Sequence, residues 1–236
     1  MSAVAILLSG GTGSRLGADI PKQYIEINGA PVIRYPIRTL LSHPGTEMLC
    51  IVCQDEWRAF IMSQVEACRS EGLEDDTRIL FAHPGVVRQE SIYKGLLELE
   101  STGLGPDTPV IITDAARPLV THELLDRCLE ALPGHDGVMP VIPMKDTVYE
   151  SRDGKSVSGL LDRSTIYAGQ APEFYYLGNY TEAVRKLTPD EILTINGTTE
   201  VAIWAGMDVV MVPGDEDNFK ITTQADLERF ELKTRE

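Results

Sequence analysis

The stretch Val4–Tyr24, which reads VAILLSGGTGSRLGADIPKQY, decides the fold of this chain. Its apolar start, Val4–Leu8, predicts a buried strand that is too short to cross a membrane. The glycines that follow allow close backbone approach, so that several N–H groups can point at one phosphate. Arg15 and Lys22 add positive charge, and the stretch therefore predicts a strand followed by an anion-binding loop.

Two familiar phosphate-binding loops do not fit these letters. The stretch lacks the G-x-x-x-x-G-K-[ST] pattern of the P-loop, and Leu16 stands where the dinucleotide fingerprint G-x-G-x-x-G requires its third glycine. Glycine-rich loops are also common between ordinary strands and helices. A plain strand-to-helix turn therefore stays as the alternative to a phosphate site.

The composition is typical of one large α/β domain that spans residues 1–236. A net charge of −15 argues against nucleic acid or an anionic membrane as a partner, because such binding depends on basic surface. It does not exclude a small anionic substrate, since charges are screened over about 8–10 Å and a few cations can dominate a cleft. Met1 and Ser2 lead directly into the first strand without room for a signal peptide, so we expect a cytoplasmic protein.

Apolar strand patterns alternate with helical patterns along the chain. The predicted strands are Val4–Leu8, Met48–Cys53, Ile79–Ala82, Val110–Thr113 and Asp208–Pro213, and the predicted helices are 32–41 with an interruption at Pro36, 57–69, 88–99, and four that start near Thr121, Asn179, Thr188 and Ala225. This alternation predicts a Rossmann-like α/β fold, with a mostly parallel, twisted sheet and helices on both faces. Ligands in such sheets bind beyond the carboxyl ends of the strands, so the glycine loop, Ser91 and Asp114 should converge on one cleft.

Cys50 and Cys53 are the two cysteines with the spacing of metal ligands. They lie on a predicted strand, where residues three apart point to opposite faces. We therefore expect buried structural cysteines that neither share a metal nor form a disulfide.

The pattern changes over residues 138–176, where short strand-like pieces flank a hairpin-like turn at Ser151–Lys155. This segment predicts a β-arm that leaves the compact body. Such an arm has unpaired edges and little core, so it is stable when it packs on another surface, most simply on a second copy of the chain. We therefore expect a homodimer formed through the arm.

Several motifs, taken in order, resemble those of one family. They are the glycine loop, Lys22, Ser91, Asp114–Pro118, Asp146-Thr147, Arg163, Gln170–Pro172 and Asn218–Thr223. Together they resemble the cytidylyltransferases that join CTP to a sugar-alcohol phosphate, and the resemblance covers nearly the whole chain. It implies a nucleotidyltransferase fold and a magnesium-dependent reaction in which an oxygen of the alcohol phosphate attacks the α-phosphorus of CTP and pyrophosphate leaves.

The resemblance also implies roles for individual residues. The catalytic cations are Arg15, Lys22 and Lys220. The CTP site comprises Leu8, Ser9, Gly10, Gly11, Gly13, Pro84, Gly85, Ser91, Asp114 and Ala115, and Asp114 is also a candidate magnesium ligand. The alcohol phosphate is held by Arg117, Thr147, Arg163 and Asn196. In the family, the two arm residues of this set often act from the partner subunit.

Simpler roles are open for three of these residues. Asp114 could cap the segment after its strand and pair with Arg117. Ser91 could be a helix N-cap, and Lys220 could be a solvated surface lysine. Their positions beside the ligand-binding edge of the predicted sheet favour the functional roles.

Two departures from the family lie on the alcohol side. Ala171 stands where the family usually has a threonine, and Ile195–Glu200 replaces a Thr-Asp segment. The amino acids found in Ser9–Gly13 and Tyr167–Gln170 favour the members that use D-ribitol 5-phosphate, a precursor of cell-wall polymers such as teichoic acid. We therefore expect D-ribitol 5-phosphate as the substrate, with 2-C-methyl-D-erythritol 4-phosphate of isoprenoid biosynthesis as the alternative.

Two other classes of function compete with this one. A nicotinamide-dependent oxidoreductase could use Asp55 for the ribose hydroxyls, but it would need the missing third glycine and a proton relay that is not apparent. A non-catalytic nucleotide-binding paralogue is suggested by Ala171 and Asn196. The cations Lys22 and Lys220, together with Arg15 and Asp114, argue against it.

Overall fold

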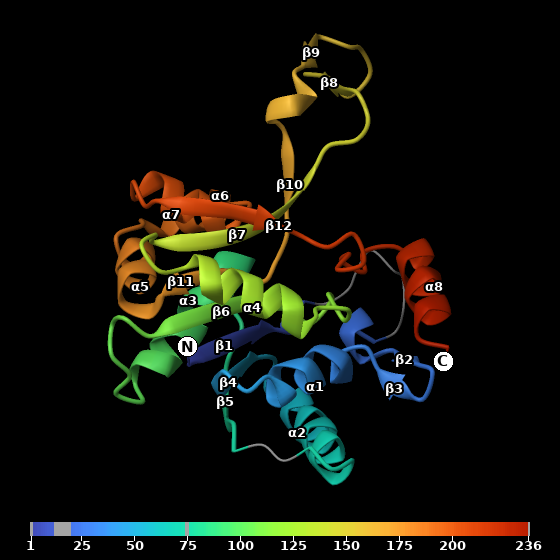
Figure 1. Ribbon diagram of the computed structural model, residues 1–236, viewed down its shortest axis with the longest axis vertical. Helices are drawn as coiled ribbons and strands as arrows, with labels where there is room; N and C mark the ends of the chain where they lie inside the picture. The colour runs from blue at the N-terminus through green and yellow to red at the C-terminus, as the bar shows by residue number, and fades with distance from the viewer. Residues whose placement is uncertain (1, 12–19, 74–75, 236) are drawn as a thin grey trace.

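The computed structural model describes residues 2–11, 20–73 and 76–235. An eight-stranded sheet runs through the body in the order β10-β7-β11-β6-β1-β4-β5, and β12 pairs with β7. Helices cover both faces of this sheet, and a β-hairpin projects away from the body (Figure 1). The predicted Rossmann-like α/β fold is confirmed.

Most neighbouring strands in the sheet run parallel. The strands are β1 (Ala3–Leu8), β4 (Thr46–Val52), β5 (Arg78–Ala82), β6 (Pro109–Asp114), β7 (Gly137–Pro143), β10 (Tyr167–Gly169), β11 (Glu173–Tyr176) and β12 (Val209–Pro213). β1 pairs in parallel with β4 and β6, β4 with β5, and β12 with β7. β10 and β11 are the antiparallel members of the sheet.

The helices belong to two layers, one on each face of the sheet, and a C-terminal cap. They are α1 (Arg34–Ser42), α2 (Asp55–Ser70), α3 (Arg88–Glu100), α4 (His122–Ala131), α5 (Leu177–Arg185), α6 (Pro189–Thr194), α7 (Thr198–Trp204) and α8 (Gln224–Lys233). Short 3-10 turns occur at Lys22–Tyr24 and Arg163–Thr165, and β2 (Glu26–Ile27) forms a hairpin with β3 (Ala30–Pro31). Among the described residues, none of the helices has the length and apolar character that crossing a membrane requires.

β1 is the strand on which both cores meet. Ala5 and Leu7 lie in one core, with side chains from α1, α2 and α4, while Val4 and Ile6 lie in the other, with side chains from α3, α5 and α7. A strand buried on both faces reads as a continuous apolar run, which explains the opening letters of the chain. The last residue of β1, Leu8, lies opposite Val52 of β4 and Asp114 of β6, so the glycine loop leaves the sheet between them.

The predicted interruption of the first helix at Pro36 is wrong. α1 begins at Arg34, so that Pro36 falls in its first turn. N–H groups of a first turn have no acceptor within the helix, and a proline there removes no hydrogen bond. The other predicted strands and helices agree with the structure to within a few residues.

Cys50 and Cys53 lie in the two opposite cores, and both are fully buried. Burial raises the pKa of Cys50 to about 12 and that of Cys53 to about 11, so both thiols stay protonated at neutral pH. The expectation of buried structural cysteines on opposite faces is confirmed.

The arm is narrower than the predicted segment 138–176. β7, β10 and β11 all belong to the main sheet, and the projecting part is the hairpin of β8 (Val148–Glu150) and β9 (Gly159–Leu161) with its flanking residues (Figure 1). A strand-like pattern does not tell whether the strand pairs with the main sheet or with its own hairpin, which is why the predicted boundaries were too wide. That residues 1–236 form a single domain stays a prediction.

Residues 214–223 connect β12 to α8 without helix or strand. Ile221 of this connection packs against Leu227 and Phe230 of α8 in a small third core. Thr223 caps α8 through reciprocal hydrogen bonds with Asp226. The connection therefore passes along the sheet's carboxyl edge while it is fixed at its end by α8.

Candidate active site

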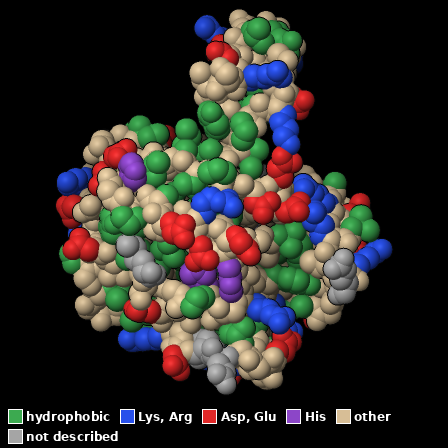
Figure 2. Space-filling model, in the orientation of Figure 1, with side chains coloured by type: hydrophobic (Ala, Val, Ile, Leu, Met, Phe, Trp, Pro, Cys, Tyr) green, Lys and Arg blue, Asp and Glu red, His purple; other side chains and the backbone are tan. Residues whose placement is uncertain are grey.

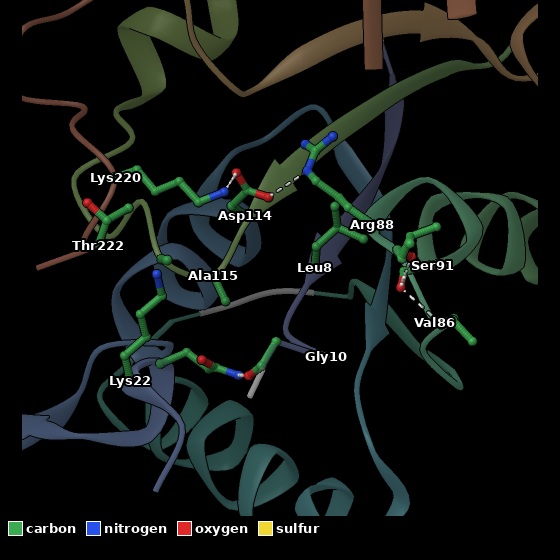
Figure 3. A pocket seen from close by; sticks show the side chains of 15 residues that line it. Leu8, Gly10, Lys22, Val86, Arg88, Ser91, Asp114, Ala115, Lys220 and Thr222 are labelled. Atoms are coloured by element: carbon green, nitrogen blue, oxygen red, sulfur yellow. Dashed lines mark hydrogen bonds and ion pairs between the residues drawn. The ribbon is translucent and has the colours of Figure 1, made fainter. Parts of the chain in front are cut away.

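A cavity of about 370 Å³ opens beyond the carboxyl ends of β1 and β6 (Figure 3). Five separate segments supply its walls, among them the glycine loop and the segments of Ser91 and Asp114, whose convergence the strand alternation predicted. The residues that line it are Leu8, Gly10, Gly11, Lys22, Gln23, Gly85, Val86, Val87, Arg88, Ser91, Asp114, Ala115, Ala116, Lys220 and Thr222. Nine of these are residues that the sequence analysis assigned to catalysis or to CTP, namely Leu8, Gly10, Gly11, Lys22, Gly85, Ser91, Asp114, Ala115 and Lys220. The predicted residues Gly13 and Arg15 lie outside the described residues.

Asp114, the last residue of β6, lies between Arg88 and Lys220. These three residues form what we call the charged wall of the cavity. Its Oδ1 lies 3.2 Å from Nε of Arg88, and its Oδ2 lies 2.9 Å from Nζ of Lys220. Figure 3 shows these two cations on opposite sides of the carboxylate. Burial alone would raise the pKa of Asp114, but Arg88 and Lys220 outweigh burial and hold this pKa well below its ordinary value. The aspartate is therefore ionised, and its side-chain ion pairs are with Arg88 and Lys220.

Hydrogen bonds from the 3-10 turn Lys22–Tyr24 hold the start of the glycine loop in place. Gln23 is buried and donates from Nε2 to the carbonyl oxygens of Ser9 and Gly11, at 2.7 and 2.8 Å. The hydroxyl of Tyr24 lies 2.9 Å from Oγ of Ser9, which is also buried and stands behind the cavity wall. These bonds fix the backbone path of the loop where it borders the cavity.

Lys22 links this turn to the segment that carries the second lysine. Its Nζ donates to the carbonyl oxygen of Ile221 at 2.5 Å, next to Lys220. Lys22 and Lys220 thus reach the same cavity from positions almost two hundred residues apart in the sequence. Both lysines line the cavity, and Lys220 is the one that pairs with the buried carboxylate of Asp114.

The turn before α3 forms the wall opposite the lysines. The N–H of Gly85 donates to Oγ of Ser91 at 2.9 Å, and this hydroxyl donates to the carbonyl oxygen of Val87 at 3.0 Å. The N–H of Val86 donates to Glu90 at 2.7 Å. The N-cap position of α3 is Val87, so Ser91 is not an N-cap. Ser91 instead holds the turn in shape from within the first turn of the helix.

The glycine loop and this turn touch at one point. A Cβ added at Gly10 would lie 2.5 Å from Cβ of Pro84, whereas a Cβ at Gly11 would meet no atom within 4 Å. Pro84, a predicted CTP residue, therefore lies behind the cavity wall and packs against the loop. Only a glycine fits the contact at position 10.

This contact predicts different outcomes for two neighbouring substitutions. Gly10→Ala is expected to lower the free energy of unfolding by about 1–3 kcal/mol, because the rigid ring of Pro84 cannot move aside without backbone shifts. Gly11→Ala, the matched control, should leave the free energy of unfolding of the ligand-free protein nearly unchanged. Urea unfolding of both variants measures the difference. Equal stability of the two variants would contradict the close approach of the loop to Pro84.

A second cavity of about 260 Å³ shares the charged wall of the first. Arg88, Asp114 and Lys220 border both cavities. The second is otherwise lined by Arg117, Met139, Gly169, Gln170, Ala171, Glu173, Asn196, Gly197, Thr198 and Thr199. Two of the predicted alcohol-phosphate residues, Arg117 and Asn196, and the departure Ala171 therefore meet in one polar pocket.

The two arm residues of the predicted alcohol-phosphate site are not brought to either cavity. Thr147 and Arg163 are exposed on the projecting hairpin, where Nη1 of Arg163 donates to the carbonyl oxygen of Lys145 at 2.8 Å. Neither residue lines the pocket that holds Arg117 and Asn196. Within one chain, the predicted site is therefore split between the body and the arm.

Sequence reasoning missed the residues that organise the charged wall. Arg88 lies 3.2 Å from Asp114, donates to Oγ1 of Thr198 at 2.6 Å and lies 3.7 Å from Glu173. Oε1 of Glu173 in turn accepts from Oγ1 of Thr199 at 2.8 Å. The one available signal was the position of Arg88, which opens a helix directly after the turn at the end of β5.

Among the described residues that line the first cavity, Asp114 is the single one with a carboxylate side chain. These residues contain no group of three or more His, Cys, Asp or Glu side chains that could bind a metal by themselves. Mg²⁺ is commonly held by one or two carboxylates together with substrate phosphates and water. Asp114 at the wall of this cavity fits that mode of binding.

Comparison with known proteins gives one family. The model of the family described as "2-C-methyl-D-erythritol 4-phosphate cytidylyltransferase" (IspD) matches residues 3–236. A protein of that name from Pseudomonas paraeruginosa is 34% identical over 231 residues, which cover 96% of this chain and 93% of the relative. A bifunctional IspD/IspF enzyme from Rhizobium rhizogenes is 32% identical, and the match covers 96% of this chain but only 55% of that protein. This chain therefore spans little more than half the length of such bifunctional relatives.

The fold agrees with solved structures of the same family. The 2-C-methyl-D-erythritol 4-phosphate cytidylyltransferase of Francisella tularensis superposes with a TM-score of 0.79 over 99% of this chain and 100% of that one, at 21% identity. The names of these relatives support the methylerythritol alternative better than the ribitol substrate that we expected first. The predicted resemblance to sugar-alcohol-phosphate cytidylyltransferases is confirmed, and the chain belongs to the 2-C-methyl-D-erythritol 4-phosphate cytidylyltransferase family of nucleotidyltransferases.

Proposed function

We propose that this chain transfers CMP from CTP to 2-C-methyl-D-erythritol 4-phosphate and releases pyrophosphate. The observation that carries the proposal is the charged wall of Arg88, Asp114 and Lys220, which borders two cavities at once. A reaction that joins two phosphates needs both substrates to meet at one cluster of charge. Family membership supports the same assignment.

The first cavity suits the nucleotide. Its floor is the glycine loop, which can receive the triphosphate beside Lys22, and Arg15 belongs to the same proposed set. The turn that Ser91 holds in shape presents backbone groups on the far side of the cavity, where we place the cytosine. This arrangement would align the α-phosphorus with the charged wall.

The second cavity suits the alcohol phosphate. Arg117 offers positive charge there, and hydroxyl and amide groups of Thr198, Thr199 and Asn196 offer hydrogen bonds to a polyol. A phosphate oxygen of this substrate would attack the α-phosphorus of CTP. The new bond joins that oxygen to phosphorus, and the bond from phosphorus to the bridging oxygen breaks, so that pyrophosphate carries the electron pair away. No side-chain nucleophile takes part.

The protein contributes position and charge to this transfer. Negative charge builds on the α-phosphate and on the leaving pyrophosphate, and preorganised cations stabilise it. Lys220 and Lys22 stand in reach of the cavity for that purpose. Magnesium, when bound with the triphosphate, would screen charge between the phosphates, and Asp114 is the described residue that would hold it.

The arm supports a proposed homodimer. On it, Tyr149, Val157 and Leu160 are 60%, 69% and 67% exposed, and Figure 2 shows hydrophobic side chains on the projecting hairpin and around its base. Exposed apolar groups of this kind mark interaction surfaces. A second copy packed there could bring its own Thr147 and Arg163 to the alcohol-phosphate pocket.

The arm arginine gives a prediction that tests this arrangement. Arg163→Ala is expected to raise the KM for the alcohol phosphate about tenfold or more, because a charge-assisted bond to phosphate is lost. The KM for CTP should stay the same. Arg152→Ala, which removes another exposed arm arginine, is the control. Steady-state kinetics with each substrate varied in turn measures both constants, and an unchanged KM for the alcohol phosphate would move that substrate away from the arm.

The function itself is tested by pyrophosphate release. The purified chain is supplied with CTP, Mg²⁺ and one alcohol phosphate at a time, with methylerythritol 4-phosphate, D-ribitol 5-phosphate and glycerol 3-phosphate as the panel. We expect turnover with methylerythritol phosphate. Preference for ribitol phosphate would restore the substrate suggested by the spelling of the motifs. If none of the three alcohol phosphates supports pyrophosphate release while CTP still binds, the result would favour a non-catalytic nucleotide-binding protein.

A further inference from the structure

The connection 214–223, which carries Lys220, is held by a side chain from outside it. Gln170 donates from Nε2 to the carbonyl oxygen of Asp215 at 2.8 Å, and its Oε1 accepts from the N–H of the same residue at 3.0 Å. A glutamine side chain offers one donating and one accepting end, so it pairs with a backbone residue as another peptide group would. Gln170 is 9% exposed, which shields both bonds from water.

Neighbouring contacts tighten the same junction. The carbonyl oxygen of Asn218 accepts from Nη1 of Arg117 at 2.5 Å, and Nδ2 of Asn218 donates to the carbonyl oxygen of Ala171 at 2.7 Å. Asn218 is fully buried. Residues 170 and 171 thus grip the connection at positions 215 and 218, directly before Lys220.

The backbone of Gln170 is itself fixed to the main sheet. Its N–H donates to the carbonyl oxygen of Pro140 in β7 at 2.8 Å, and the residue follows β10 at the point where the chain returns from the arm. Gly214 packs so closely that a Cβ there would lie 2.5 Å from Oε1 of Gln170. These contacts therefore fix the position of the Gln170 side-chain amide between the sheet and the connection.

We infer that Gln170 is a positioning residue for Lys220 in the reaction proposed above. Gln170 does not need to touch the substrate, because both ends of its amide are taken up by Asp215. It holds the connection at a distance from the sheet that lets Nζ of Lys220 reach Asp114. Without that hold, the ammonium group would lose its fixed place beside the transferred phosphate.

The substitution Gln170→Glu tests this inference. It keeps the size and the accepting end of the side chain, but it sets a carboxylate oxygen against the carbonyl oxygen of Asp215. We expect kcat to fall about 10- to 100-fold while the KM for CTP changes less than about twofold, because a small displacement of a catalytic group costs rate and not ground-state binding. Gln64→Glu on α2 makes the same chemical change away from the site and serves as the control. Unchanged kcat in Gln170→Glu would overturn the inference.

Gly214→Ala disturbs the same contact from the other side and covers the case in which Gln170→Glu does not fold. Its new methyl group would displace the Gln170 amide without adding charge. Thermal unfolding identifies the variants that are folded, and any folded one should show the same loss of kcat at constant KM for CTP. A folded Gly214→Ala with wild-type kcat would count against the inference.

A double-mutant cycle separates positioning of Lys220 from general damage. In a Lys220→Ala background, Gln170→Glu should lower the residual kcat by less than about twofold, since the group on which it acts is gone. If instead Gln170→Glu lowers kcat by the same factor with and without Lys220, Gln170 acts on a group other than Lys220.

A measurement without substrate keeps this inference distinct from the proposed function. The rate at which an amine-reactive reagent modifies Lys220, read by peptide mass spectrometry, should rise several-fold in Gln170→Glu relative to the wild type, with Lys233 as the internal reference. If the wild type releases no pyrophosphate with any acceptor, the proposed function fails, yet faster modification of Lys220 would still support the inference. Equal modification rates would overturn it whatever the activity.

Discussion

Lys220→Ala is expected to lower kcat for pyrophosphate release about 10²- to 10³-fold, the usual effect of removing one preorganised group that stabilises transition-state charge. The KM for CTP should change little, because the lysine is paired with Asp114 before the substrate arrives. The fold should survive, since the side chain of Lys220 is 37% exposed and belongs to no apolar core. Initial rates at saturating CTP, together with a thermal unfolding curve, measure both quantities.

Lys233→Ala is a closely matched control for this variant. The side chain of Lys233 is also 37% exposed, and it also pairs with an aspartate, Asp217, at 2.8 Å. It lines neither of the two cavities that share the charged wall. Turnover should therefore be normal. A Lys220→Ala enzyme with wild-type kcat would remove this lysine from the mechanism and would leave Lys22 and Arg88 as the described cations that line the first cavity.

Arg88→Ala should give the largest loss of stability, about 3 kcal/mol in the free energy of unfolding at neutral pH. The arginine joins Asp114 and Glu173, whose side chains are only 10% and 9% exposed, and its removal leaves buried carboxylates with too little positive charge. Lys220 still pairs with Asp114, which keeps the loss from being greater. Urea unfolding of the variant and of the wild type measures the difference.

The pH dependence of this loss has a definite sign. In the wild type the pKa of Asp114 is held below its ordinary value, so the ionised group stabilises the fold above about pH 4 and this contribution disappears as the pH falls further. Removal of Arg88 raises that pKa. The difference in unfolding free energy should therefore be greatest above about pH 4 and shrink in more acidic solution.

An exposed arginine provides the comparison. Arg185 forms ion pairs with Glu182 and Glu100 on the surface, and its replacement by alanine should have no measurable effect on stability. If the losses at positions 88 and 185 were equal, the buried charge cluster would not have the importance that its burial suggests.

The sequence was informative where a local pattern carries the structure. The continuous apolar run of Val4–Leu8 marked a strand buried on both faces, and β4, β5, β6 and β12 were visible as further apolar runs. Because the carboxyl ends of parallel strands share one edge, the letters after those runs were enough to bring Ser91, Asp114 and the glycine loop together. Such inferences need only short stretches of the chain.

Contacts between distant segments were beyond that kind of reasoning. Arg88 bonds with Thr198, which lies 110 positions further along the chain, and no feature of either local sequence points to the other. Gln170 likewise has a role that depends on which backbone residue meets its amide. The boundaries of the arm failed for a related reason, since β7 and β10 look like hairpin strands until their partners in the main sheet are known.

The wall shared by the two cavities has a consequence for ligand design. A molecule that joined a nucleotide to a polyol phosphate would meet Arg88, Asp114 and Lys220 from both sides and would occupy both cavities after a single binding event. Its second half would then bind at the high effective concentration that a short tether provides, without a second loss of translational freedom. Tethered ligands should accordingly gain far more affinity at this site than the sum of their separate fragments would suggest.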